Sequence, residues 1–238
     1  MKKLLALLLV GMMIFSLAAC GDNNTTDPDK DNPGVSQSGE NSNGGEKNNE
    51  VDYSKLANGI AESFGVYEGK NISWKVLTVD EENKKALLIT DKCIDLIPFN
   101  TTDESFTWEN SEIRTWLSGE FFENAFTDAE KTLIIETVNK NPANSQTGIR
   151  GCGDTTDRVF ILSETEALDY FEENEHRLAT SYEGDVFQWW LRTPGDSESW
   201  FMLINDEGGL YYAGSTSQSS YGVRPVIWID LSTGENAE

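Results

Sequence analysis

Residues 187–230 read FQWWLRTPGDSESWFMLINDEGGLYYAGSTSQSSYGVRPVIWID, and they carry most of the evidence for the fold. Short apolar and aromatic runs alternate here with glycine and polar residues, a pattern typical of antiparallel strands joined by turns. The DEGG sequence at 206–209 supplies turn residues, so the strands on either side of it are expected to form a hairpin. The pattern predicts strands over 187–192, 200–205, 210–213 and 223–230.

The residues before this stretch predict another hairpin and short helices. The runs at 71–79 and 84–90 are rich in strand-forming residues and flank a polar turn. Ile113, Trp116 and Leu117 fall on one face of a short helix. Capping boxes at 127–130 and 163–166 each predict the start of another helix. The second helix would place Ala167, Leu168 and Phe171 on one face, and a strand is expected before it at 158–162.

Helices early and strands late, without a repeating strand-helix-strand pattern, indicate an α+β protein. We expect a single compact domain over residues 51–238, with a largely antiparallel sheet and two to three short helices. A chain of this length buries enough surface for its own core.

Five ordered segments carry a family resemblance. These segments are ISWKVL at 72–77, IRTWL at 113–117, VFILS at 159–163, WWLRTPG at 189–195 and GVRPV at 222–226. In this order they resemble the uncharacterised bacterial family called domain of unknown function 6273, which is common on secreted and lipid-anchored proteins.

A more distant similarity concerns the WWLR and GVRP segments, which resemble the C-type-lectin-like fold as used by formylglycine-generating enzymes. This similarity implies a C-type-lectin-like topology, and for the enzymes it would imply a copper site built from two nearby cysteines in the last third of the chain. No cysteine lies there, and Gly222-Val223-Arg224 lacks the aromatic residue of the enzymes' terminal element. The sequence therefore predicts no cofactor, and similarity of fold alone carries no activity.

The N-terminus has the pattern of a targeting signal. Lys2 and Lys3 precede an apolar run, and LAAC at 17–20 ends it with small residues before a cysteine, so the segment resembles a bacterial lipoprotein signal with its lipobox. The resemblance implies cleavage of a signal peptide at residues 1–19 and attachment of diacylglycerol to the thiol of Cys20. The protein is then extracytoplasmic and anchored to the bacterial cell membrane through acyl chains. The alternative is an ordinary secretory signal with an unrelated cysteine.

Composition restricts the partners. The formal charge is −23, and no basic stretch interrupts the acidic background, so nucleic acid is excluded as a partner. Residues 20–50 follow the signal with Val35 as the one sizeable apolar side chain, and we expect them to form a disordered acidic and polar linker. Acids at 27–31 begin like a calcium loop, but the glycine and the closing glutamate of that motif are missing, so no metal site is predicted.

The cysteines leave alternatives open. Cys93 and Cys152 either form a disulfide or remain two separate thiols. Cys152 lies between two glycines and could be a nucleophile with His176, the only histidine, as its base. His176, however, sits in a charged segment typical of an exposed helix end. A pair of carboxylates for glycoside hydrolysis is a further option, but the sequence cannot nominate one among 41 acids.

Arg192 and Arg224 lie among tryptophans near the end of the domain. They either line a polar pocket or, as we prefer, tie the terminal strands together through ion pairs and stacking on tryptophan. Alternation along the strand sends Trp189 and Trp190 to opposite faces, so one is expected in the core. Trp74, Trp116 and Trp228 also fit a core.

The loops between the last strands offer a surface for a ligand. They combine hydroxyls, amides and acids with aromatic rings, a mixture suited to sugars, although ordinary surface turns have the same composition. We therefore expect a noncatalytic recognition module for a glycan, a cell-wall component or a protein, with an extracytoplasmic hydrolase or transferase as the alternative. The candidate ligand-binding residues are Asp196, Trp200, Asn205, Asp206, Tyr211, Tyr212 and Tyr221.

Overall fold

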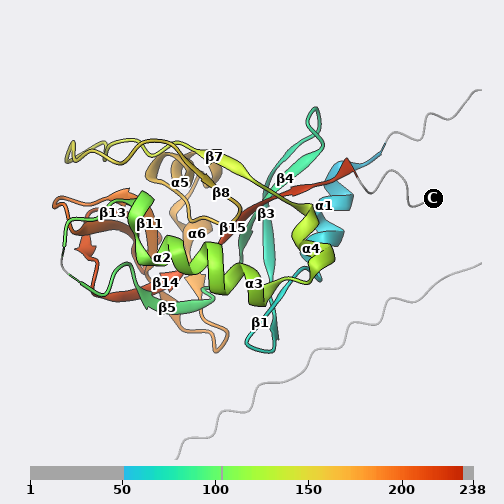
Figure 1. Ribbon diagram of the computed structural model, residues 1–238, viewed down its shortest axis with the longest axis horizontal. Coiled ribbons are helices and arrows are strands. Elements are labelled where there is room, and N and C mark those ends of the chain that lie inside the picture. The colour runs from blue at the N-terminus through green and yellow to red at the C-terminus, as the bar shows by residue number, and fades with distance from the viewer. Residues whose placement is uncertain (1–50, 103, 233–238) are drawn as a thin grey trace, which may run out of the picture. The chain divides into compact units, whose positions relative to one another are not determined.

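Two sheets form the centre of the structure, a computed structural model that describes residues 51–102 and 104–232 (Figure 1). The five-stranded sheet is ordered β13 (Leu210–Thr216), β12 (Trp200–Ile204), β11 (Trp189–Pro194), β14 (Ser220–Val223) and β5 (Asp95–Pro98). The four-stranded sheet is ordered β3 (Trp74–Asp80), β4 (Lys85–Thr90), β15 (Val226–Asp230) and β6 (Ile134–Ile135). Neighbouring strands in both sheets are antiparallel, except that β11 and β14 are parallel.

The sheets are joined where two segments cross from one to the other. β4 continues into β5 through residues 91–94, and β14 continues into β15. The crossings are bonded to each other, because the N–H of Thr90 donates to the Pro225 carbonyl at 3.0 Å and that of Ile94 donates to the Val223 carbonyl at 2.9 Å. The GVRPV segment therefore lies at the junction of the two sheets.

Short helices surround the sheets. A 3₁₀ turn, η1 (Trp108–Asn110), precedes the helix that begins at Glu112, and a π-helical segment, η2 (Leu117–Phe121), continues it. Within the residues that the structure describes, no helix has the length and apolar character to cross a membrane. The α-helices are α1 (Tyr53–Ala61), α2 (Glu112–Trp116), α3 (Phe122–Ala125), α4 (Asp128–Leu133), α5 (Glu164–Tyr170) and α6 (Asn174–Arg177).

Three two-stranded ladders complete the part of the fold that the structure describes. The pairs are β1 (Val66–Tyr67) with β2 (Lys70–Asn71), β7 (Thr137–Asn139) with β8 (Thr155–Asp157), and β9 (Ala179–Thr180) with β10 (Val186–Phe187). Residues 140–154 join β7 to β8, and we call this segment the arm. In Figure 1 the arm runs from the β7–β8 ladder along the top of the view toward β13.

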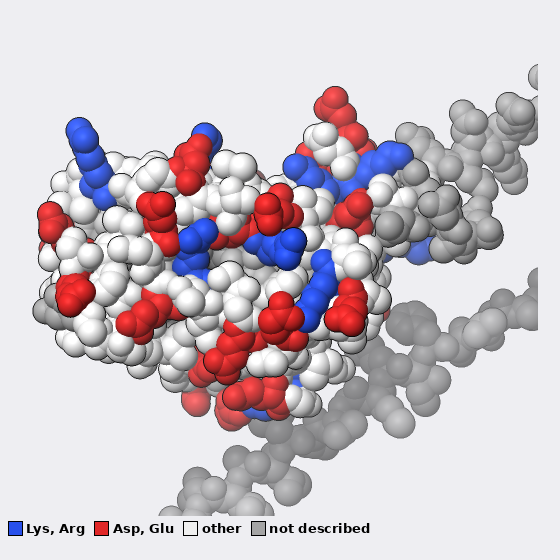
Figure 2. Space-filling view, in the orientation of Figure 1, with Lys and Arg blue, Asp and Glu red and all other residues white. Residues whose placement is uncertain are grey.

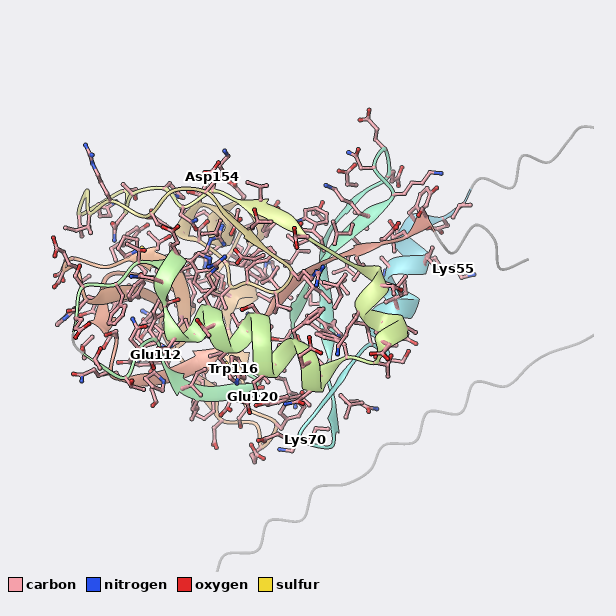
Figure 3. All side chains as sticks on the ribbon, in the orientation of Figure 1. Lys55, Lys70, Glu112, Trp116, Glu120 and Asp154 are labelled. Atoms are coloured by element: carbon pink, nitrogen blue, oxygen red, sulfur yellow. The ribbon has the colours of Figure 1, made fainter. Side chains whose placement is uncertain are left out.

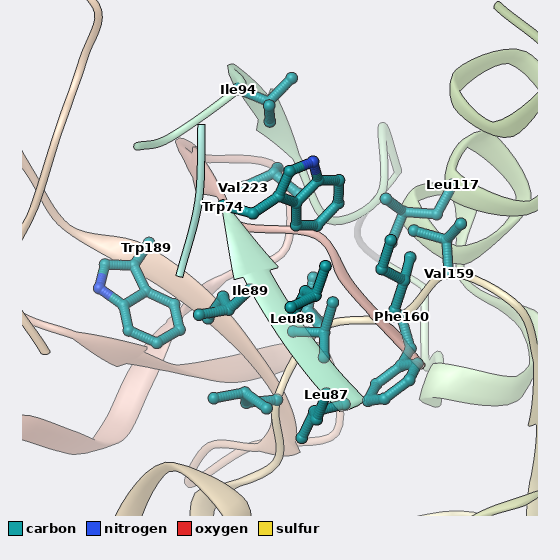
Figure 4. Close-up of a cluster of buried hydrophobic side chains, with 14 of the residues drawn as sticks. Trp74, Leu87, Leu88, Ile89, Ile94, Leu117, Val159, Phe160, Trp189 and Val223 are labelled. Atoms are coloured by element: carbon teal, nitrogen blue, oxygen red, sulfur yellow. The ribbon is translucent and has the colours of Figure 1, made fainter. Parts of the chain in front are cut away.

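The core reaches both sides of β4. Leu87, Leu88 and Ile89 are at most 1% exposed, so this strand is covered on both faces. In Figure 4, Trp189 of β11 lies to one side of the strand and Leu117 of η2 to the other. The uninterrupted apolar run of β4 thus reflects burial on both faces.

Most expected elements are confirmed, including the α+β class. The runs at 71–79 and 84–90 form the antiparallel β3–β4 hairpin, and residues 206–209 turn between β12 and β13. Capping boxes begin α4 and α5 as expected.

Three details differ from the expectations. Residues 158–162 form no strand, and only Phe160 makes an isolated bridge, to Val226. The apolar residues 159–162 are buried between elements instead of pairing along their length. Leu168 is 46% exposed and does not join the buried Ala167. The strand expected at 223–230 is divided at Arg224 and Pro225, where the chain changes sheets.

Candidate functional site

A pocket of about 410 Å³ lies between the arm, the segment before η1 and strands β11 and β12, and we call it the arm pocket. It is formed by segments distant in sequence that meet beside the five-stranded sheet. Its lining residues are Ser105, Phe106, Thr107, Trp108, Gly148, Ile149, Arg150, Gly151, Arg192, Pro194, Glu198 and Phe201.

Polar contacts hold the arm beside the sheet. The side-chain amide of Asn144 donates to the carbonyls of Pro194 and Tyr212, at 2.8 and 2.9 Å. The hydroxyl and N–H of Ser145 donate to the buried carboxylate of Glu164. Gly151 is also required, because a Cβ there would lie 2.3 Å from the carbonyl oxygen of Asn141 on the opposite side of the arm.

The floor of the arm pocket is formed by Trp108 and Phe201, aromatic residues that are at most 1% exposed. Phe201 stacks on Phe99 with ring centroids 3.5 Å apart, and Trp108 packs edge-on against Phe99 at 6.3 Å. The indole N–H of Trp108 donates to Asp157 at 3.3 Å, so its polar atom is already engaged. Phe106 and Ile149 are only half-buried and present apolar surface to whatever enters.

The rim carries two exposed charges. Neither Arg150 nor Glu198 forms an ion pair with any part of the chain that the structure describes. Both charges are therefore available to a ligand. Figure 2 shows that acidic side chains are spread over the displayed face, with fewer basic ones between them.

Arg192 lines the arm pocket, but its guanidinium faces protein groups. It forms an ion pair with Glu166 through two N–H groups, at 2.5 and 2.8 Å. The remaining bonds go to Asn141 and to the carbonyls of Ile161 and Lys140. Because a guanidinium has five N–H groups and these contacts use all of them, Arg192 has no donor left for a ligand.

Arg224 is fully buried at the junction of the sheets. Its guanidinium carbon lies 4.8 Å from the centroid of the Trp189 ring, and its Nε donates to the Thr90 carbonyl at 2.9 Å. Burial lowers the pKa of Arg224 to about 10. Its Nη2 has no hydrogen-bond partner and it forms no ion pair among the described residues, so this arginine stacks on tryptophan without a paired carboxylate.

Cys93 lies beside Arg224. Its side chain is 4% exposed, and burial raises the pKa of its thiol to about 11, although the charge of Arg224 acts in the opposite direction. A Cβ on Gly222 would lie 2.4 Å from the Cys93 sulfur, so this glycine of the GVRPV segment leaves room for the thiol.

Cys93 and Cys152 are free cysteines, so of the two alternatives the structure has separate thiols. Cys152 follows Gly151 of the arm pocket, whereas His176 is exposed on α6. Arg177, next to His176, donates to the Gly208 carbonyl in the β12–β13 turn. Cys152 and His176 therefore lie toward opposite ends of β12, which is roughly 13 Å long at about 3.3 Å per residue.

The candidate loop residues do not meet at one site. Asp196 and Trp200 lie at the start of β12, whereas Asn205 and Asp206 lie at its end. The Asn205 side chain accepts the N–H groups of Glu207 and Gly209, so it stabilises the turn.

The candidate tyrosines are also dispersed. Tyr211 is exposed on β13, beside the turn, and the carbonyl of neighbouring Tyr212 accepts the Asn144 amide. Tyr221, on β14, packs edge-on against Trp190 at 4.9 Å and donates to Ser215. These contacts stabilise the sheet and the arm.

The tryptophans divide between the interior and the surface. Trp189 and Trp190 are both fully buried, so both faces of β11 are internal, and Trp74 is also buried. Trp116 and Trp228 are half-buried. Figure 3 shows Trp116 between Glu112 and Glu120 along one helix.

Two further expectations concern anchoring and metals. Cys20, the signal at 1–19 and the linker at 20–50 lie outside the described residues. Among the residues that are described, no group of three or more His, Cys, Asp or Glu side chains is placed to hold a metal ion.

The sequence reasoning missed most residues of the arm pocket. Phe106, Ile149, Arg150 and Glu198 come from three separate segments. The available signal was the glycine-rich sequence at 148–153, whose backbone can approach closely, but sequence alone does not indicate which strand the arm meets.

Comparison with known proteins gives one match. Neither the curated proteins nor the solved structures contain a significant match to this chain. A family model matches residues 83–231, from the β3–β4 hairpin to the end of β15. This range includes both sheet crossings and all the segments that line the arm pocket, and on this match the chain belongs to the family described as Domain of unknown function (DUF6273).

Proposed function

We propose that this protein is a lipid-anchored, extracytoplasmic recognition module that binds one unit of a glycan, a cell-wall component or a protein in the arm pocket without catalysing a reaction. The observation that carries the proposal is the combination of an aromatic floor with two unpaired charges on the rim. Small-ligand sites typically combine apolar walls with a few polar groups, and the volume of about 410 Å³ is in the range for such sites.

The polar groups that would suggest catalysis are engaged elsewhere. Arg192 is saturated by protein contacts, and Trp108 donates to Asp157. Cys152 is next to the arm pocket, whereas His176 lies toward the other end of β12. The two residues are therefore not arranged as a nucleophile and its base. Glu198 is the only acid in the lining, whereas glycoside hydrolysis requires two.

The anchoring part of the proposal rests on the LAAC sequence before Gly21, and the similarity to the C-type-lectin-like fold adds only an analogy of fold. Labelling cells with a fatty-acid analogue tests the anchor. We expect label in the wild-type protein and none in Cys20→Ala, because that thiol is the atom that accepts the lipid. Equal label in both proteins would reject lipidation at Cys20.

Binding is tested by thermal unfolding of the full-length protein with a panel of wall glycan fragments, wall peptides and unrelated peptides. We expect at least one compound to raise the Tm without being consumed, as judged by mass spectrometry. Arg150→Gln and Glu198→Gln should reduce the shift. Arg158→Gln and Glu175→Gln, which change exposed charges outside the pocket lining, serve as controls. Turnover of a compound, or a shift insensitive to both pocket variants, would contradict the proposal.

A further inference from the structure

We infer that the arm pocket binds an apolar side chain of a basic peptide segment in a partner protein, with lysine or arginine flanking that side chain. This inference rests on the proposed function and chooses among its ligand classes. It follows from three properties of the site: which polar atoms remain free, how charge is distributed, and which occupants the chain itself could supply.

The free surface of the arm pocket suits an apolar group better than a sugar. Recognition of hydroxyls needs several donors and acceptors that are not already bonded. Arg192 has no free N–H, the indole N–H of Trp108 donates to Asp157, and the Thr107 hydroxyl donates to Asn110. The lining contains no asparagine or glutamine, and its side chains with unbonded polar atoms, Ser105, Arg150 and Glu198, are all exposed. The half-buried Phe106 and Ile149 remain as the main contact surface.

Charge around the pocket favours a basic partner. Glu198 is on the rim, and Glu104, Glu109 and Asp196 are sequence neighbours of lining residues. All four are exposed, and none forms an ion pair with the described residues. Arg150 is the single exposed base in the lining. Complementary charge increases the rate at which partners meet and selects their orientation.

The chain is a poor occupant of its own pocket. From Val51 onward it has 34 acidic against 14 basic residues, so a second copy would be repelled. The segment at 21–50 contains Val35 as its one sizeable apolar side chain and is also acidic. The occupant is therefore a different, basic chain, and an extended segment can insert one side chain between the arm and β11.

The test begins with a display library of random dodecapeptides panned against the full-length protein. Sequences that bind Ile149→Ala equally well are removed in a counter-selection. We expect the retained peptides to share an aromatic or branched apolar residue flanked by lysine or arginine. Selected peptides are then synthesised and titrated against the variants, together with a chitin oligosaccharide as the glycan probe.

The variants separate apolar from electrostatic contributions. Ile149→Ala and Glu198→Lys should each weaken the selected peptide at least about fivefold, since a few central contacts dominate such interfaces. The matched controls Leu168→Ala and Glu175→Lys alter exposed residues elsewhere and should change affinity less than about twofold. Unchanged thermal unfolding of the variants shows that they remain folded.

The results of the selection and the titrations either support the inference or overturn it. Replacement of the central apolar residue of the peptide by glycine should abolish measurable binding. Selection of peptides without the expected pattern, removal of every binder by the counter-selection, or unchanged affinity for Glu198→Lys overturns the inference. Binding of the chitin oligosaccharide in the arm pocket without peptide binding also overturns it, while leaving the proposed recognition function standing. Binding of neither probe class, with no pocket-dependent Tm shift in the panel, rejects both.

Discussion

Arg192 joins four parts of the molecule. From β11 it reaches Glu166 on α5, the Ile161 carbonyl in the buried 159–162 segment, and Asn141 and Lys140 at the base of the arm. Its side chain is 1% exposed, whereas that of Glu166 is 26% exposed, so the ion pair is buried on the arginine side and partly open to water on the other. This geometry agrees with the preferred interpretation, in which Arg192 holds neighbouring segments together. The aromatic ring on which its guanidinium stacks is that of Phe160 and not of a tryptophan.

We expect Arg192→Ala to lower the free energy of unfolding by about 3 to 5 kcal/mol, because the partly buried Glu166 carboxylate loses its partner and the buried acceptors around the guanidinium remain unsatisfied. Arg192→Lys should restore little of this loss, since an ammonium group cannot reproduce five planar bonds. Denaturant unfolding measures both.

Arg158 provides the comparison for Arg192. Its contact with Glu136 is exposed on both sides, so Arg158→Ala should cost about 0 to 1 kcal/mol. Similar losses for Arg192→Ala and Arg158→Ala would show that the Arg192 network adds no stability.

The buried thiol of Cys93 gives stability a specific pH dependence. Its pKa is about 11 in the folded protein, against 9.0 as its ordinary value. Between these two values the unfolded chain loses the proton first, so the folded state binds more protons and the free energy of unfolding falls as pH rises. We expect the wild type to lose on the order of 1 to 3 kcal/mol relative to Cys93→Ala between about pH 8 and 11.

The comparison with Cys93→Ala is needed because other groups titrate in the same range. The lowered pKa of Arg224, about 10, acts with the opposite sign. Arg224 is present in both proteins, so the part of its effect that comes from burial cancels, while the part that comes from the Cys93 charge belongs to the pair. Urea unfolding at several pH values provides the measurement. If the difference in free energy of unfolding between the wild type and Cys93→Ala stays constant from pH 8 to 11, the thiol ionises as readily in the folded protein as in the unfolded chain.

At the scale of elements, the capping boxes connect helices to their surroundings. Glu166 receives the N–H of Ser163 and also binds Arg192, so the start of α5 is tied to β11. Glu130 likewise receives the N–H of Thr127 and that of Gly65. Each box therefore both begins a helix and fixes its position.

We expect Ser163→Ala to destabilise the protein more than Thr127→Ala does. Loss of an N-cap typically costs about 0.5 to 2 kcal/mol, and the upper end applies where the freed N–H groups are buried. Ser163 is 2% exposed, whereas Thr127 is exposed. Denaturant midpoints of the two variants test the order, and a larger loss for Thr127→Ala would contradict it.

At the scale of the whole molecule, the crossing segments make the two sheets interdependent. β4 with β5, and β14 with β15, each contribute to both sheets, so neither sheet can form fully without the other. The described residues lie in one compact unit.

We expect a protein that begins at Val51 to unfold in a single cooperative transition in urea, because the residues that it lacks supply almost no apolar surface. Limited proteolysis of the full-length protein should cut within residues 21–50 and then stop. Rapid cutting throughout 51–232 would show that the domain depends on the preceding residues.

The sequence by itself determined the α+β class, the β3–β4 and β12–β13 hairpins, and the starts of α4 and α5. These features depend on local chemistry: apolar periodicity, turn residues, and caps that act over three residues. The proposed anchor at Cys20 is likewise a local pattern and remains a prediction.

Only the tertiary structure decided where the arm meets β11, and therefore which residues form the arm pocket. Phe106, Ile149 and Glu198 are distant in sequence, and nothing local specifies their approach. The same holds for the 158–162 segment: its apolar run matches a strand, but its carbonyls at Ile161 and Leu162 bind the side chain and N–H of Arg192. Long-range packing decides such partners, because a buried carbonyl needs a donor but its own sequence does not specify which one.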